Sequence, residues 1–266
     1  MIMARAPQRS RPEQIARRAA EILAPFLLLA ALWQIASFYF PKYLFPSLAD
    51  VAAHVLAIFV SWSLFAEVLA TIGRILAGLV GAFVLGAAIA AAMMQLRAVD
   101  RFIGPILTFF QGIPALSWVV FAIIWFHGTE PRIFFIMTMT SLPAFTFQVL
   151  DALRGMSKDL VEMVMSLRPT RAKMLRVMVL PAILPDILTA WKVNLGNASR
   201  VVVVAELVGA TGGVGYELLQ QQQIFDMAGA LAWTLQLVFF VLIAQRIIAF
   251  IETRAFRYRA VSERAL

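Results

Sequence analysis

Apolar residues fill six segments, each long enough to cross a hydrocarbon layer of about 30 Å, with shorter polar or basic stretches between them. The predicted spans are residues 22–40, 66–94, 102–126, 132–150, 186–210 and 227–250. The second is longer than a bilayer requires, so we expect it to begin outside the lipid or to tilt. The pattern predicts an all-α integral membrane protein with six transmembrane helices.

The same pattern divides the chain into four parts. A basic tail occupies residues 1–21, and the first transmembrane helix with the periplasmic segment after it occupies 22–60. A core domain follows at 61–250, with a long loop at 151–185, and a second tail ends the chain at 251–266. The first span follows basic residues, as a signal peptide does, but lacks an Ala-x-Ala cleavage pattern, so we expect it to remain uncleaved.

Composition supports a membrane protein. The chain is 62% hydrophobic, whereas soluble domains are roughly 45–50% apolar, and one water-soluble core of this length could not bury the excess. Cysteine is absent, which excludes disulfides and thiolate metal sites.

Positive charge is distributed unevenly between the predicted loops. Seventeen of the 23 basic residues lie in the two tails and in the loops after the second and fourth spans. Only Lys42 and Arg132 lie on the other side. The positive-inside rule therefore predicts that both termini are cytoplasmic. The net charge of +8 is dispersed over four segments, which argues against a nucleic-acid surface.

The long loop contains the stretch EMVMSLRPTRAKMLRVMVLPAILP. A short helix is predicted over about 157–167, broken by Arg168-Pro169 because the residue before a proline avoids the α region. A second helix is predicted from Thr170, its N-cap, to Leu180, and Pro181 should stop it. The result would be a helical hairpin on the cytoplasmic face.

Two interpretations of this hairpin remain open from the residues alone. Its arginines could bind anionic lipid while the hairpin lies in the headgroup layer. Alternatively, its methionines could pack against an irregular surface of a partner protein.

The fifth predicted span carries charge at membrane depth, where it is costly and usually faces a cavity or a partner. At 100° per residue, one face about 120° wide holds Lys192, Gly196, Ser199, Arg200, Val203 and Glu206. This face could line a translocation path, with Arg200 attracting an anion and Glu206 shaping an outer gate. Equally, the charges could pair with other spans, for example Arg74 with Glu206 or Glu67 with Arg200.

Other features concern packing and gating. Gln111, Gly112 and Pro114 predict a kink in the third span, which could serve gating or packing only. Small residues about four apart in the second span predict close approach of another helix. After the fifth span, a glycine turn should lead to a short polar helix outside the membrane, which could meet an external binding protein.

An enzyme is not indicated. The four lysines follow Pro41, Ser157, Ala172 and Trp191, so the chain has no phosphate loop, and it contains no catalytic constellation. His54 and His127 are isolated from each other and from any ligand cluster, so no metal site is expected.

The long loop resembles the cytoplasmic signature of ATP-binding-cassette importer permeases, which reads E-A-A, three residues, G, nine residues, I-x-L-P. Glu162-Met163-Val164 matches the first triplet, Arg168 stands at the glycine, and Met178-Val179-Leu180-Pro181 closes the motif in register. Further matches to the nitrate, sulfonate and taurine group are Leu44-Phe45-Pro46-Ser47, Thr71-Ile72-Gly73-Arg74, Gln111–Trp118, Glu206-Leu207-Val208-Gly209 and Gly213-Val214-Gly215-Tyr216.

One departure from the family pattern concerns the turn. A glycine there would adopt a positive φ cheaply, so we expect Arg168-Pro169 to turn in another way. The resemblance marks Glu162, Met163, Val164, Arg168, Pro169, Leu180 and Pro181 as coupling residues.

The resemblance implies a type I importer permease fold in the bacterial inner membrane. It implies a homodimer, two cytoplasmic ATP-binding subunits docked at residues 158–181 and a periplasmic binding protein that delivers a small, anionic solute. The chain itself would bind no cofactor, since ATP and magnesium would lie on the partner. The alternatives are a stand-alone secondary transporter or channel, and a membrane scaffold that binds lipid.

Overall fold

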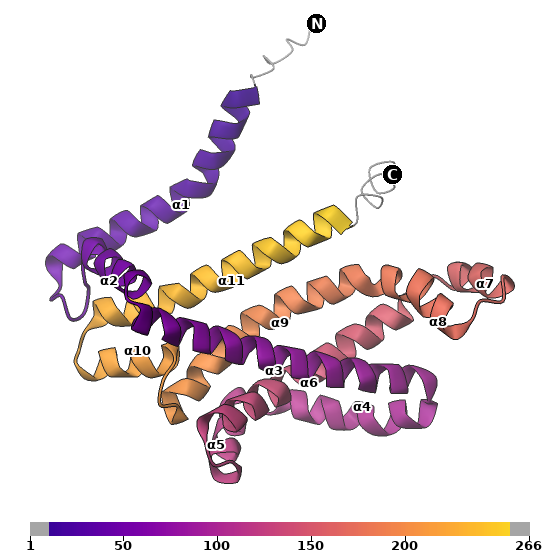
Figure 1. Cartoon of the computed structure of the whole chain (residues 1–266). Helices are drawn as coiled ribbons and strands as arrows, with labels where there is room; N and C mark the ends of the chain where they lie inside the picture. The colour runs from indigo at the N-terminus through magenta and orange to yellow at the C-terminus, as the bar shows by residue number, and fades with distance from the viewer. Residues whose placement is uncertain (1–10, 256–266) are drawn as a thin grey trace, which may run out of the picture.

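The computed structural model describes residues 11–255, and every regular element within them is helical. The elements are α1 (Arg11–Tyr39), α2 (Leu48–Val60), α3 (Trp62–Gln95), α4 (Arg97–Gly112), α5 (Ala115–Trp125), α6 (Thr129–Arg154), α7 (Lys158–Ser166), α8 (Arg171–Met174), a π-helical turn η1 (Leu175–Val179), α9 (Leu180–Gly209), α10 (Val214–Gln223) and α11 (Met227–Ala255). Figure 1 shows them as an elongated bundle from which α1 diverges.

Four helical segments are long and apolar enough to cross a membrane. They are α3, α6, the continuous segment Arg171–Gly209 and α11, and the bent pair α4–α5 makes a fifth if it is one span. The first predicted span corresponds to the shorter apolar stretch Leu23–Tyr39 of α1. The all-α membrane architecture is therefore confirmed.

The connecting segments at the two ends of the bundle differ in charge. Figure 1 shows the α3–α4 connection, α7 and α8 at one end, and α2, α5 and α10 at the other. The first end contains the two connecting loops that carry clusters of basic residues. The helix order thus agrees with the alternation of sides expected from charge.

The core forms where α3, α6 and α9 pack together. Its fully buried side chains include Ile75 and Leu79 of α3, Phe145 of α6 and Val202 of α9. Glycines allow the close approach of α3 to α6: a Cβ at Gly86 would lie 3.1 Å from the backbone nitrogen of Thr146. This confirms the helix contact predicted from the small residues of the second span.

The predicted kink in the third span is a sharp break. The axes of α4 and α5 differ by 97°. Ile113 is extended, with φ −76° and ψ 123°, as expected before a proline, and Pro114 is the N-cap of α5. Gly112 ends α4 with a conventional φ and open space around it, so the proline rather than the glycine makes the turn.

The segment between the first two predicted spans contains a helix, α2, that was not among those spans. Ser47 caps α2 by accepting a hydrogen bond from the backbone nitrogen of Asp50 at 3.1 Å. The indole nitrogen of Trp33 in α1 donates to the carbonyl of Pro46 at 3.0 Å, which fixes the turn between the two helices.

The turn after α7 differs from expectation. Arg168 adopts a positive φ of 46°, so it makes the same kind of turn that a glycine would make. Its backbone nitrogen donates to the carbonyl of Met165 at 3.0 Å, which closes the end of α7. The expectation of a different turn was wrong, because these end-closing bonds hold a side-chain-bearing residue in the strained region.

Pro181 does not stop the second helix. The helical segment runs without interruption from Arg171 to Gly209, through both Pro181 and Pro185. Immediately before Pro181 the π turn widens the helix, and Leu180 donates to the carbonyl of Leu175, five residues back. This wider turn accommodates the proline ring where it would otherwise clash with the preceding turn. Only Arg171–Met174 thus remains of the hairpin's independent second helix.

Candidate transport site

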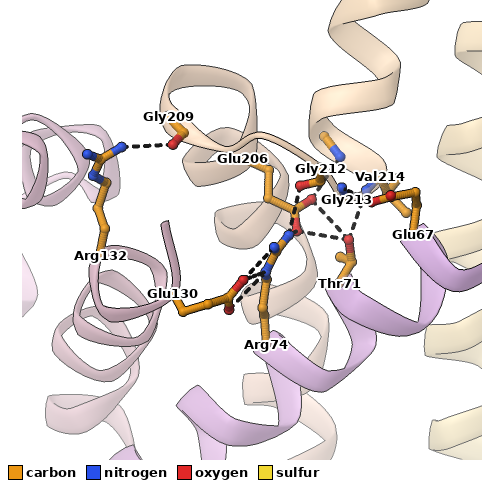
Figure 2. A network of polar contacts seen from close by, with 11 residues as sticks. Glu67, Thr71, Arg74, Glu130, Arg132, Glu206, Gly209, Gly212, Gly213 and Val214 are labelled. Carbon is orange, nitrogen blue, oxygen red and sulfur yellow. Dashed lines mark hydrogen bonds and ion pairs between the residues drawn. The ribbon is translucent and has the colours of Figure 1, made fainter. Parts of the chain in front are cut away.

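A buried carboxylate joins three segments at the end of the bundle that contains α10. Glu206 of α9 is 1% exposed, and Arg74 of α3 donates to it from Nη1 at 2.7 Å. Thr71 donates from Oγ1 at 2.8 Å, and the backbone nitrogen of Gly215 donates at 2.8 Å. Figure 2 shows Arg74 and Thr71 converging on the carboxyl group of Glu206. Such complete pairing is what a charge inside a membrane protein requires.

Arg74 extends the network to a second carboxylate. Its Nε and Nη2 donate to Glu130 of α6 at 3.1 and 2.6 Å, and its Nη1 also donates to the carbonyl of Gly212 at 2.8 Å. The guanidinium therefore connects α3, α6, α9 and the loop after α9 (Figure 2). A planar fork of five donors suits this role, which a lysine could not fill.

The glycine loop between α9 and α10 is bound by its backbone. Glu67 accepts from the nitrogen of Gly213 at 2.5 Å, and Thr71 Oγ1 accepts from the nitrogen of Val214 at 2.8 Å. Gly213 has φ +108°, a conformation that side-chain-bearing residues rarely adopt. The loop is therefore attached to α3 at successive residues.

A second arginine caps two helices at the same end. Arg132 of α6 donates to the carbonyl of Gly209 at 2.8 Å and to the carbonyl of Phe126 at 3.4 Å. These carbonyls lie at the C-terminal ends of α9 and α5, where a cation interacts favourably with the helix dipole. Arg132, which the charge count placed on the outer side, is thus a structural group.

The predicted polar face of α9 divides into two parts. Ser199, Arg200 and Val203 line a cavity of about 430 Å³ between α9, α10 and α11. Lys192 and Asn197 line another, of about 540 Å³, between α6, α9 and α11. Gly196, Arg200 and Gln245 line both cavities.

Glu206 lies outside both linings because it pairs with Arg74. Of the two structural pairings considered, Arg74 with Glu206 is present, whereas Glu67 binds the glycine loop. Arg74, for which the sequence left gating and helix packing open, links α3 to α6 and α9.

The two cations on the cavity face differ in their partners. Lys192 forms an ion pair with Glu252 of α11. Arg200 is exposed, and within the part of the chain that the structure describes it makes no hydrogen bond or ion pair. It lies nine residues before the end of α9, about 14 Å along the axis, so it is a free charge at membrane depth.

The predicted coupling residues form an exposed surface at the opposite end. Met163 and Met165 of α7 are 59% and 55% exposed, and Leu167 is 78% exposed. Glu162, Arg168, Leu180 and Pro181 are also exposed, while Val164 and Pro169 are half-buried. Within the described residues this apolar surface of α7 is not covered by another helix.

Several groups of the network were not predicted from the sequence. Glu130 was not singled out, Thr71 was named only within a family motif, and Glu67 was considered only as a partner of Arg200. Spacing could have suggested Thr71, which lies one helical turn before Arg74 and four residues after Glu67. Glu130 carries no such signal, because only the packing of α3 against α6 brings it to Arg74.

These features define a class of protein: a multi-pass membrane protein with cavities between its spans and an exposed helix at one end. Residues 82–257 match the model of the family "Binding-protein-dependent transport system inner membrane component". The chain therefore belongs to that family, and it is a permease subunit of an ATP-binding-cassette importer.

Curated relatives agree with this assignment. The taurine transport system permease protein TauC of Escherichia coli (strain K12) is 27% identical over 196 residues, 71% of each chain. The formylaminopyrimidine transport permease protein ThiX of Halalkalibacterium halodurans is 27% identical over 222 residues, 81% of this chain and 88% of the relative. The bicarbonate transport system permease protein CmpB of Synechococcus elongatus is 25% identical over 168 residues, 62% of this chain and 60% of the relative.

Solved structures share the fold. A chain of the methionine transporter MetNI in an inward-facing conformation superposes with a TM-score of 0.61 at 20% identity, covering 73% of this chain and 96% of that one. A chain of an amino acid ABC transporter gives a TM-score of 0.60 at 11% identity, covering 71% and 92%. The type I importer permease fold is thereby confirmed.

Proposed function

We propose that this permease works as a homodimer in the bacterial inner membrane, with both termini in the cytoplasm. Two ATP-binding subunits dock on α7 and the turn after it, and a periplasmic binding protein delivers a small solute to the other end. The observation that carries the proposal is the exposed apolar surface of α7, at the basic end of a chain of this family.

ATP and magnesium would be bound by the partner, because the sequence has no phosphate loop. Closure of the ATP-binding subunits would move α7. The continuous segment Arg171–Gly209 would then carry that motion across the membrane as one rigid rod. Alternating access through rigid-body motion follows from this mechanical continuity.

The solute path follows the polar face of α9. Lys192, Ser199 and Arg200 line it, and Arg200 attracts an anion because its charge has no protein partner within the described residues. Glu206 shapes the outer end of the path indirectly, through its hold on Arg74 and Gly215.

Purification from native membranes tests the docking. The intact protein should recover an ATP-binding subunit, and Met163→Asp should abolish recovery by placing a charge in an apolar contact. Met163→Leu should retain it. A Glu162→Cys variant should crosslink to that subunit. Recovery of no such subunit, with crosslinks to lipid only, would favour the scaffold alternative, and solute transport by the purified chain alone would favour a secondary transporter.

Uptake tests the path. Arg200→Gln should lower solute uptake at least tenfold while the assembled complex remains intact, and Arg200→Lys should retain part of it. Unchanged uptake by the assembled Arg200→Gln variant would remove Arg200 from the path.

A further inference from the structure

The two cavities beside α9 differ in chemistry, and they share three lining residues. The cavity toward α10 is lined mainly by aliphatic side chains, among them Leu237, Val238 and Val241 of α11. Its two hydroxyl groups are already engaged, since Ser199 donates to the carbonyl of Gly196 and Thr234 to that of Ala230. This cavity therefore offers apolar contact and few free donors.

The cavity toward α6 has donors available. Gln148 accepts from Asn194 through Oε1 at 2.7 Å, which leaves its own amide hydrogens without a protein acceptor among the described residues. Asn197 is exposed in the same lining. Lys192 is neutralised by Glu252, so the uncompensated charge of this cavity is the guanidinium of Arg200.

The junction of the two cavities contains a glycine with open space beside it. A Cβ built at Gly196 would meet only the amide nitrogen of Gln245, at 3.8 Å, which is ordinary contact. Gly196, Arg200 and Gln245 belong to both linings, so a solute of a few atoms could extend from one cavity into the other.

We infer that this junction, at Gly196, Arg200 and Gln245, is a binding site for a small organic anion. The guanidinium of Arg200 and the amide of Gln148 bind the anionic head, and the aliphatic cavity receives a short apolar body. A carboxylate or sulfonate with a few carbon atoms fits both halves, whereas an inorganic anion would use only one. A role of this site in transport rests on the proposed function, but its preference for anions can be measured without transport.

This chain contains no cysteine, so one introduced cysteine is its only thiol and its labelling can be followed on the purified protein. Gly196→Cys, in the full-length protein in membranes, is treated with 2-sulfonatoethyl methanethiosulfonate or with its cationic trimethylammonioethyl analogue. Rates are normalised to Gln222→Cys, at an exposed position of α10. The anionic reagent should react about tenfold faster at position 196.

A second substitution assigns the preference to its cause. Arg200→Gln in the Gly196→Cys background should remove the tenfold preference, and Arg200→Lys should retain it. Equal reaction of both reagents, or a preference that survives Arg200→Gln, would overturn the inference. If Gly196→Cys fails to insert, Ser199→Cys reports on the aliphatic cavity next to Arg200 with a near-isosteric change.

Protection distinguishes an organic from an inorganic anion. Ethanesulfonate should slow the labelling of Gly196→Cys more than nitrate does at equal ionic strength. Val241→Phe, which fills the aliphatic cavity, should abolish that difference without changing the charge preference. Equal protection by nitrate and ethanesulfonate would contradict the claim that the aliphatic cavity binds the apolar part of the anion. Failure to recover an ATP-binding subunit would instead contradict the proposed function and leave these rates unchanged.

Discussion

Arg74 Nη1 donates to Glu206 Oε1 at 2.7 Å, which joins α3 to α9 across 132 residues of sequence. Both groups are largely shielded, with side-chain exposures of 11% for Arg74 and 0% for Glu206. Removing one member would leave the other charged and uncompensated, so the pair is a constraint on how these two helices can move apart. The glycine loop after α9 shares this constraint through Gly212 and Gly215.

Loss of the buried carboxylate should destabilise the protein. We expect Glu206→Ala to lower the free energy of unfolding by about 3 kcal/mol, because Arg74 loses its buried partner. Thermal unfolding in detergent measures the change. Glu130→Gln is the matched control: that side chain is 67% exposed, so its effect should stay within about 1 kcal/mol. Equal effects of the two substitutions would show that burial of Glu206 is not what matters.

A side chain at the glycine loop should displace the loop. Gly213 has φ +108°, and a Cβ there would contact both Glu206 and Arg74. Gly213→Ala should therefore destabilise by about 2 kcal/mol or more. Gly112→Ala serves as the comparison: a Cβ at Gly112 would meet nothing within 4 Å, so this substitution should be neutral or slightly stabilising. Proteolysis at the 210–215 loop should increase only in the Gly213 variant.

The turn after α7 should improve with glycine. Arg168→Gly removes the strain of φ +46° and should stabilise that turn by up to about 1 kcal/mol. Hydrogen exchange of the α7 amides measures local opening. Arg168→Ala removes the charge but keeps the strain, so it should give no gain. Slower exchange in the alanine variant would indicate that charge, rather than backbone strain, limits this turn.

Glu217 of α10 should make stability depend on pH. Burial, and then repulsion from Glu67, raise the pKa of its carboxyl group. A carboxyl whose pKa is raised on folding contributes stability at pH below its unfolded value, and that contribution is lost as pH rises through the folded value. Glu217→Gln cannot ionise, so it should be more stable than the parent at neutral pH and closer to the parent in acid.

The measurement is the difference in unfolding temperature between the parent and Glu217→Gln, followed from acid to neutral pH. Glu162→Gln, on the exposed surface of α7, controls for the general effect of removing one carboxylate. A gap between Glu217→Gln and the parent that does not widen as pH rises would contradict the assignment.

Part of the molecule could be predicted because its determinants are local. The spans follow from runs of apolar residues, since a backbone in lipid must satisfy its own hydrogen bonds as a helix. The N-caps follow from single hydroxyl residues: Thr170 was predicted as one, and Ser47 caps a helix that was overlooked. The polar face of α9 follows from helical periodicity, and four of its residues do line a common cavity.

The sequence by itself therefore determined the class of protein, the approximate spans and the exposed basic segment with Met163, because these depend on composition and on neighbours within a turn or two. Only the tertiary structure decided that Glu206 pairs with Arg74 while Arg200 has no partner among residues 11–255. It also decided that the helix continues through Pro181, and that Arg168 adopts a glycine-like turn. The Arg74–Glu206 pair depends on which helices pack together, and the passage through Pro181 depends on the widened turn before it. The spacing of residues along one helix determines neither the distance between side chains of different helices nor the backbone strain at a turn.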